Sequence, residues 1–227
     1  MSNDHDHEST LDVLFTAAVA FELRPFALRL GLETVGPELT HATHGARRVA
    51  LLAAGMGRRG DESFRAALRD LRPGAAINIG IAGALDLAHP AGSTWVVEEW
   101  RHQLPPHGPA ARADTALTAV VGSALDAAGI TWGNAVAVTV DEPLHDADQR
   151  DRIRAGSSAQ LVEMEGASWA TIAAEHDVPF AAIRVVSDHA DRPLRNEVKA
   201  AGAEFREAVE ALDAVARALL VEHPASP

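Results

Sequence analysis

Short apolar runs separated by stretches of helical periodicity restrict this 227-residue chain to few folds. The runs lack the regular alternation of apolar and polar residues that marks a half-exposed strand, so they are typical of strands covered on both faces. They occupy residues 11–18, 48–54, 75–79, 94–97, 134–139 and 180–186. The pattern predicts a three-layer α/β/α fold with a central mixed β-sheet.

Helices are expected where apolar residues recur every three or four positions. These stretches are residues 22–30, 64–71, 117–128, 166–175 and 205–219. Residues 101–113, which are rich in Pro, His and Gly, are expected to form a loop. Residues 1–10 are polar and predict a disordered lead, which leaves a single domain over residues 11–222.

The composition excludes several classes of protein. Cysteine is absent, so disulfides, thiolate nucleophiles and Cys-ligated metal sites are excluded. The net charge of −12 disfavours binding to nucleic acids and to anionic membranes. The chain has no uncharged apolar run of the roughly 20 residues that span a bilayer, and residues 1–10 do not resemble a secretory signal. We therefore expect a soluble cytoplasmic protein with neither a nucleic-acid nor a membrane partner.

Acidic residues stand near several of the expected strand ends. Glu22 follows the first apolar run, Glu163 and Glu165 precede an expected helix, and Asp188 follows the last run. Ligands of doubly covered α/β sheets bind beyond the carboxyl ends of the strands, so these acids can converge on one pocket as catalytic groups. The alternative is that they are acids at helix N-termini, helix caps or turn residues. Spacing alone leaves both interpretations open.

Two glycine-rich segments also follow expected strands, at residues 55–57 (GMG) and 80–83 (GIAG). Glycines at such places let backbone N–H groups approach a ligand. The spacing at residues 55–60 matches a dinucleotide-binding fingerprint, but the acid that completes that fingerprint is missing. The sequence also lacks a Walker lysine, a Gly-x-Ser-x-Gly elbow and a His-Glu-x-x-His pair, which disfavours the enzyme classes that carry them.

Four segments, in a fixed order, resemble those of a known enzyme superfamily. They are residues 55–58 (GMGR), 78–85 (NIGIAGAL), 162–167 (VEMEGA) and 183–188 (IRVVSD). Their order and spacing resemble the nucleoside phosphorylase/nucleosidase superfamily over nearly the whole chain. The sequence is most similar to the methylthioadenosine/S-adenosylhomocysteine nucleosidase branch and its hydrolase relatives, futalosine hydrolase and the hopanoid-associated enzyme. The resemblance implies a nucleoside phosphorylase-like fold and cleavage of the N-glycosidic bond of a purine nucleoside.

The resemblance implies a role for each of three acids. Glu22 matches the group that orients or activates the attacking water. Glu165 matches the carboxylate that binds the ribose hydroxyls, with Met164 packed under the sugar, and Asp188 matches the acid that protonates N7 of the purine. These roles suit the chemistry, because the sugar becomes oxocarbenium-like and the departing purine is anionic. The reaction requires no metal or redox cofactor, and we expect none.

Further positions follow from the same resemblance. Arg184 and Ser187 are expected to support Asp188, and Ala82 and Gly83 to border the site of the anion or water. The substrate-binding candidates are Ala82, Gly83, Pro143, Leu144, Glu163, Met164, Glu165, Arg184 and Ser187. A homodimer is expected, because relatives complete their pocket with a partner chain.

Hydrolysis is expected in preference to phosphorolysis. Asn78 stands where some family phosphorylases carry an arginine, and Ile81 replaces a small hydroxylated residue. Glu22 favours water as the nucleophile. Arg58 is the candidate anion-binding residue, although a surface arginine at a helix start is an equal interpretation. The alternatives are a phosphate-dependent purine nucleoside phosphorylase and an inactive nucleoside-binding relative.

Two departures from the family pattern concern the substrate. Pro143 stands where adenosine-specific members place a base-stacking aromatic residue, and the chain contains no tyrosine. The loop at residues 101–113 is shorter than the family segment that helps to cover the 5′ substituent. The ribosyl chemistry is therefore expected on a methylthioadenosine/S-adenosylhomocysteine-like or futalosine-like substrate, with the base and the 5′ group left open.

Overall fold

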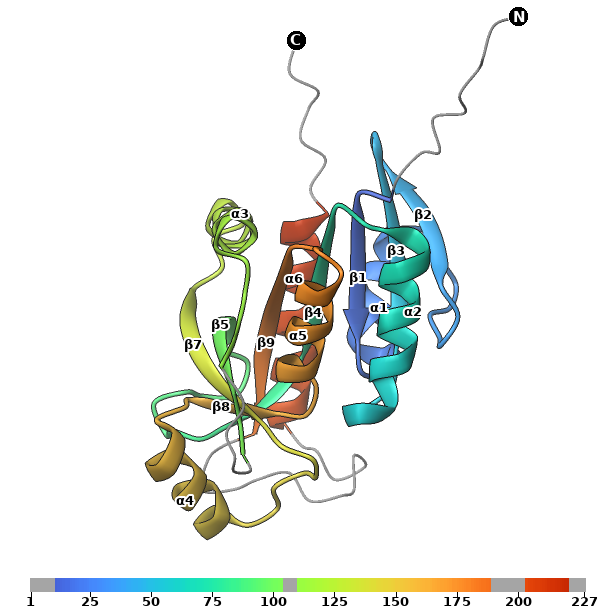
Figure 1. The fold of residues 1–227 in the computed structure, drawn as a ribbon. Helices are drawn as coiled ribbons and strands as arrows, with labels where there is room; N and C mark the ends of the chain where they lie inside the picture. The colour runs from blue at the N-terminus through green and yellow to red at the C-terminus, as the bar shows by residue number, and fades with distance from the viewer. Residues whose placement is uncertain (1–10, 104–109, 189–202, 221–227) are drawn as a thin grey trace, which may run out of the picture.

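The computed structural model describes residues 11–103, 110–188 and 203–220, which form a β-sheet with helices on both faces (Figure 1). The strands of this nine-stranded sheet follow the order β2-β3-β1-β4-β8-β7-β5-β6, and β9 pairs with both β4 and β5. Neighbouring strands are parallel in some pairs, such as β1 and β4, and antiparallel in others, such as β5 and β9. The sheet is therefore mixed, as the sequence predicts.

Strands and helices alternate along much of the chain. The strands are β1 (Val13–Ala17), β2 (Thr40–His44), β3 (Arg47–Ala53), β4 (Ala75–Ala84), β5 (Thr94–His102), β6 (Ala111–Arg112), β7 (Trp132–Thr139), β8 (Leu161–Glu163) and β9 (Phe180–Asp188). The helices are α1 (Ala20–Arg29), α2 (Asp61–Leu71), α3 (Thr115–Ala127), α4 (Ala147–Ser157), α5 (Gly166–Glu175) and α6 (Ala203–Leu219), with the short 3-10 helix η1 (Gly57–Gly60).

β4 is the strand that brings distant parts of the sequence together. It pairs in parallel with β9 along most of its length and with β1 over its first four residues, and its last two residues pair antiparallel with β8. The strands β4, β9, β5, β7 and β8 each pair with the next, and β8 returns to β4, so the sheet closes into a ring. Near the end of β4, Gly83 lies in register with both Val162 and Asp188. Three of the four motif segments therefore meet at this point.

Helices cover both faces of the sheet (Figure 1), and a hydrophobic core lies beneath them on each face. On one face, Phe64 of α2 stacks on Trp169 of α5, with 5.0 Å between the ring centroids. On the other face, Phe26 of α1 packs against Phe15 of β1 at 4.9 Å, and α6 lies beside α1. Each such aromatic side chain contributes roughly 1.5–3 kcal/mol by leaving water. The predicted three-layer arrangement is confirmed.

β4 continues through residues 80–83, which the apolar pattern places beyond the end of the strand. These residues pair with β9, so the glycines there belong to a strand and form no turn. A Cβ on Gly80 would lie 3.0 Å from Oε1 of Glu22, and one on Gly83 would lie 2.8 Å from Nη2 of Arg150. The two glycines therefore make room for charged side chains beside the strand.

Several elements were not expected from the sequence. β2 and α4 are mostly polar and half-buried or exposed, so they lack an apolar stripe, and β8 is three residues long. The loop predicted at residues 101–113 is partly wrong, because β5 extends to His102 and β6 forms at Ala111–Arg112. These strands are stabilised by pairing with distant strands, which a local pattern does not record.

Some predictions fall outside the described residues. The lead at residues 1–10 and residues 221–222 at the end of the expected domain lie there, and the single-domain organisation stays a prediction. Within the described ranges, none of the helices combines the length and the apolar character needed to cross a membrane.

Gly166, the first residue of α5, should tolerate no larger side chain. A Cβ at this position would lie 2.0 Å from Nε1 of the buried Trp100. Gly166→Ala is therefore expected to lower the free energy of unfolding by roughly 1–3 kcal/mol, the usual cost of overpacking. In the control, Gly156→Ala in α4, the new Cβ meets nothing within 4 Å. That change should be neutral or stabilising by up to about 1 kcal/mol. Urea denaturation measures both, and equal effects would contradict this packing.

Candidate active site

Glu22 lies just beyond β1 and turns its carboxyl group onto β4. Its Oε2 accepts the N–H of Val19, the N-cap of α1, at 3.1 Å, which is the half of a capping box that a glutamate at the third helical position supplies. Its Oε1 accepts the N–H of Ile81 at 2.9 Å. Burial raises the pKa of Glu22 above its ordinary value, although these two N–H groups act in the opposite direction. Glu22 is therefore both a helix cap and a buried carboxyl group that joins the start of α1 to β4.

Glu163 and Arg184 form a buried ion pair, with Nη2 of Arg184 2.8 Å from Oε2 of Glu163. The same oxygen accepts the N–H groups of Glu165 at 3.2 Å and Gly166 at 2.7 Å, and the hydroxyl of Thr139 donates to Oε1. Glu163 is predicted to bind substrate, but four protein donors already occupy its carboxylate. It therefore positions the start of α5.

Glu165 forms the N-cap of α5, and its Oε1 accepts the N–H of Gly57 at 2.7 Å. Gly57 has a φ of +56°, a left-handed conformation that favours glycine, and the methyl carbon of Met164 lies 3.6 Å from the place of a Cβ there. Burial first, and then the charge of Glu163, raises the pKa of Glu165 to about 8. Glu22 adds to this effect. The sequence-predicted neighbours Glu165 and Met164 therefore lie together over the turn at Gly57.

Asp188 ends β9 and is held from two sides. Its Oδ2 accepts from Nη2 of Arg150 at 2.6 Å, and both side chains are buried. The Oγ of Ser187 lies 2.9 Å from Oδ1 of Asp188 and 3.2 Å from the carbonyl oxygen of Ala82. The predicted support from Ser187 is therefore present. Arg184, predicted to give the same support, bonds instead to Glu163 and Asn78.

Ala82 and Gly83 are predicted to border the site of an anion or water, but in the structure they contact other side chains of the protein. The carbonyl of Ala82 faces Ser187, and the guanidinium of Arg150 fills the space over Gly83. These two residues therefore hold the groups that surround Asp188.

The loop after β7 carries two predicted substrate contacts, Pro143 and Leu144, and only one of them is exposed. Leu144 is buried in a hydrophobic cluster and its carbonyl accepts from Arg150, so its side chain belongs to the core. Pro143 is exposed. Arg58 is also exposed, and its Nε lies 3.1 Å from Oδ1 of Asp141 in the same loop. Pro143 and Arg58 are therefore the predicted positions that remain accessible at this side of the site.

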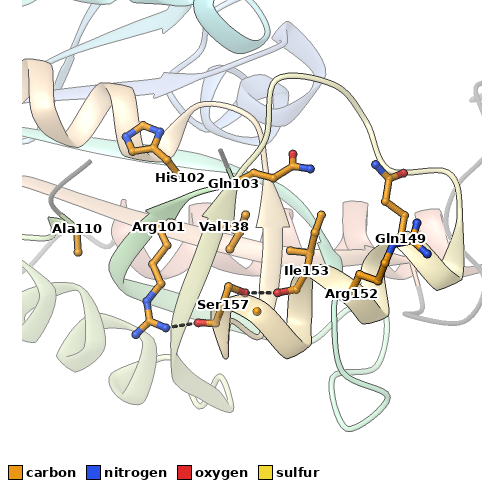
Figure 2. Close-up of a pocket in the computed structure, with 10 residues that line it drawn as sticks. Arg101, His102, Gln103, Ala110, Val138, Gln149, Arg152, Ile153 and Ser157 are labelled. Carbon is orange, nitrogen blue, oxygen red and sulfur yellow. Dashed lines mark hydrogen bonds between the residues drawn. The ribbon is translucent and has the colours of Figure 1, made fainter. Parts of the chain in front are cut away.

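A cavity of about 570 Å³ lies between α4 and the ends of β5 and β7 (Figure 2). Arg101 points toward the carbonyl oxygen of Ser157 at its edge, and Gln149 and Arg152 of α4 lie along another side. The residues that line it do not include Glu22, Glu163, Glu165 or Asp188. The cavity is therefore separate from the acidic residues.

Arg150 is the site residue that the sequence pattern does not reveal. It is the buried residue of α4, a helix whose other side chains are exposed or half-buried. An arginine in a polar segment is ordinarily a solvated side chain. Its contact with Asp188 joins residues 38 positions apart, so no local spacing points to it.

Comparison with known proteins agrees with the motifs and with this arrangement. The family model of the phosphorylase superfamily matches residues 13–221, which is nearly the whole described chain. The chain belongs to the phosphorylase superfamily. The predicted resemblance is confirmed.

Curated relatives carry nucleosidase names. The 5′-methylthioadenosine/S-adenosylhomocysteine nucleosidase of Lysinibacillus sphaericus is 28% identical over 173 residues, covering 69% of this chain and 75% of the relative. The enzyme of the same name from Glaesserella parasuis is 31% identical over 159 residues, covering 63% and 69%.

Solved structures share the fold. The Helicobacter pylori 5′-methylthioadenosine/S-adenosylhomocysteine nucleosidase with butyl-thio-DADMe-Immucillin-A has a TM-score of 0.78 at 18% identity, over 93% of this chain and 97% of that one. Futalosine hydrolase of Helicobacter pylori has a TM-score of 0.77 at 17% identity, over 92% and 96%. The predicted nucleoside phosphorylase-like fold is confirmed.

The raised pKa of Glu165 predicts a pH dependence of stability. In the unfolded chain this carboxyl titrates near 4.5, whereas in the folded protein its pKa is about 8. The folded state therefore holds the proton more tightly, and the free energy of unfolding falls as the pH rises from 4.5 to 8. Within this range, the titration of Glu165 lowers the free energy of unfolding by up to about 1.4 kcal/mol for each pH unit.

Glu165→Gln removes this titration and keeps an oxygen that accepts the Gly57 N–H. The variant should gain stability relative to the wild type as the pH rises through that window, in urea denaturation at several pH values. Glu142→Gln, at an exposed glutamate, is the control and should follow the wild type. If the free energy of unfolding had the same pH dependence in the wild type and in Glu165→Gln, the effect of burial on the pKa of Glu165 would be refuted.

Proposed function

We propose that this chain is a nucleosidase that hydrolyses the N-glycosidic bond of a purine nucleoside. The observation that carries the proposal is the gathering of Glu22, Glu165 and Asp188, from three separate elements, around the end of β4 in a phosphorylase-superfamily chain. Hydrolysis of this bond needs a water activator, a carboxylate at the sugar and a proton donor at the base, and the three acids supply these groups.

In the proposed reaction, Glu22 takes a proton from a water molecule as the water oxygen bonds to C1′ of the ribose. The C1′–N9 bond breaks, its electron pair stays on the purine, and Asp188 gives a proton to N7. The products are the free sugar and the free base. Glu22 and Asp188 return to their starting states by proton exchange with solvent, so no further reactant is consumed.

Glu165 holds the sugar in this proposal. One carboxyl oxygen bonds to the N–H of Gly57, and the other is directed to the ribose hydroxyls. Met164, which packs against the same turn, lies under the ribose. The positive charge that develops on the sugar is stabilised by this carboxyl and by its neighbour Glu22.

Water is favoured over phosphate by the groups near Glu22. The N–H of Ile81, a donor that an anion would need, already bonds to the Glu22 carboxyl. Asn78, in the place of a phosphorylase arginine, is engaged with Thr16 and Arg184. A buried carboxylate repels a phosphate dianion. Phosphorolysis is the alternative, and measuring base release with and without phosphate distinguishes it from hydrolysis.

The substrate class follows the named relatives. We propose a purine nucleoside with a 5′ substituent, of the methylthioadenosine/S-adenosylhomocysteine or futalosine type. The exposed Pro143, in place of an aromatic residue, leaves the base without that stacking partner. A cytoplasmic location and a role in nucleoside catabolism are part of the same proposal.

A nucleoside panel tests the function. Methylthioadenosine, S-adenosylhomocysteine, futalosine, adenosine and inosine are incubated with the enzyme, with and without phosphate, and the free base is measured. We expect base release that does not depend on phosphate. Release only with phosphate, with ribose 1-phosphate as a product, would make the chain a phosphorylase. No release from any nucleoside would favour an inactive binding relative.

Asp188→Asn tests the proton donor within the same panel. The amide cannot donate a carboxyl proton, so kcat should fall roughly 10²–10⁴-fold, the usual contribution of general acid catalysis. Asp151→Asn, at an exposed residue of α4, is the control and should match the wild type. Unchanged turnover by Asp188→Asn would reject this assignment.

We also propose a homodimer, as the family resemblance implies. Sedimentation velocity at the concentrations used for the assay should give twice the mass of 23.9 kDa. An active monomer would contradict the expectation that a partner chain completes the pocket.

A further inference from the structure

Arg150 is a buried arginine whose side chain reaches from α4 to the end of β9. The residue is 4% exposed, and its guanidinium is held by backbone as well as by the Asp188 carboxylate. Nη1 donates to the carbonyl of Ala84 at 3.1 Å, and Nη2 donates to the carbonyl of Leu144 at 3.2 Å. The planar fork of an arginine suits such a set of separate acceptors.

Gly83 provides the space that the guanidinium occupies. A Cβ at this position would lie 2.8–3.0 Å from Nη2, Cζ and Nη1 of Arg150. Since Gly83 is in register with Asp188, the guanidinium lies beside the carboxylate, and Nη2 reaches Oδ2 at 2.6 Å. The position of the cation is therefore fixed by β4 and by the loop after β7, independently of Asp188.

We propose that Arg150 is the positioning residue of Asp188: by binding Oδ2, it makes Oδ1 the oxygen that carries the proton to the purine. This inference rests on the proposed function. Arg150 itself does not contact the base in this proposal. It acts by fixing the rotation of the carboxyl group, so that the proton is presented from one oxygen and in one direction.

Ser187 is placed to serve both protonation states of Oδ1. Its Oγ lies within hydrogen-bond distance of Oδ1 of Asp188 and of the carbonyl oxygen of Ala82, at 2.9 and 3.2 Å. A hydroxyl has one proton, so it donates to one acceptor at a time. It can donate to Ala82 while Oδ1 carries a proton, and to Oδ1 after that proton has passed to the base. Oδ2 keeps its bond to Arg150 in both states.

A purely structural role for Arg150 makes a different prediction. The bonds to Ala84 and Leu144 anchor the loop after β7, and their loss would disturb the site whatever residue stands at position 188. A positioning role depends on the carboxyl group itself. A double-mutant cycle between Arg150 and Asp188 therefore separates the two roles.

The experiment measures kcat and KM on the best purine nucleoside of the panel for wild type, Arg150→Met, Asp188→Asn and the double variant. We expect Arg150→Met to lower kcat roughly 10–100-fold, as misplacement of a catalytic group does, with KM within about threefold. In the Asp188→Asn background the same change should alter kcat less than about threefold. Arg150→Lys keeps the charge without the fork and should recover part of kcat.

Arg154→Met is the matched control. Arg154 lies one turn along α4, and its guanidinium pairs at the surface with Asp86 at 2.6 Å. Its removal should leave kcat and KM unchanged.

A riboside with an activated leaving group gives a second readout. The p-nitrophenolate of p-nitrophenyl riboside departs without a proton, so Arg150→Met should retain its activity on this substrate. Where Arg150→Met does not fold, as shown by circular dichroism, Arg150→Lys carries the same comparisons.

Two outcomes would overturn the inference. An equal loss of kcat in the wild-type and Asp188→Asn backgrounds would show that Arg150 only anchors the loop, and an unchanged kcat in Arg150→Met would show that it has no part in the reaction. Both comparisons require an active wild type. If the wild type releases no base, that first measurement rejects the proposed function, and with it the inference about Arg150.

Discussion

The buried ion pair between Arg184 and Glu163 is the interaction on which the rest of the site depends. Burial of a charge is tolerated only when it is paired and hydrogen-bonded, and loss of one partner of such a pair costs roughly 3–5 kcal/mol. Arg184 is 1% exposed and bonds to Glu163 and Asn78. Glu163 in turn binds the first N–H groups of α5, from whose start Glu165 projects. The motif residues therefore form one structural unit before any substrate is present.

One cation does not balance three buried acids. Arg184 opposes the rise in pKa of both Glu22 and Glu165, but burial outweighs it at each, and Glu163 raises the pKa of Glu165 further. An uncompensated ionised carboxylate is costly in the free protein and stabilises a positive charge that develops beside it. The shortage of cations that makes ionised Glu165 unfavourable is therefore the feature that suits an oxocarbenium-like sugar in the proposed reaction.

The apolar pattern predicted the layers, and it predicted α5 and β9 closely, because buried strands and amphipathic helices leave a local record in the sequence. It did not predict α4, whose buried residue is Arg150, or the continuation of β4 through Gly80 and Gly83. Those features depend on contacts between residues far apart in the chain. The motifs pointed to Glu165 and Asp188, whose roles stay predictions. Glu163 and Leu144 are positioning and core residues instead, because their surroundings are set by α5, Arg184 and the cluster beneath the loop.

The two ends of the site have different electrostatic surroundings, because acids outnumber cations at one end and are matched by a cation at the other. Glu22, Glu163 and Glu165 stand at the end proposed to hold the sugar, whereas Arg150 lies beside Asp188 at the end proposed to hold the base. Cleavage of an N-glycosidic bond moves electrons in the matching direction, from the sugar to the purine. Fixed charges arranged along that direction stabilise the transition state without reorganisation. Because the guanidinium of Arg150 is held over Gly83 by backbone carbonyls, this polarity is built into β4 and the loop after β7, and the substrate does not have to create it.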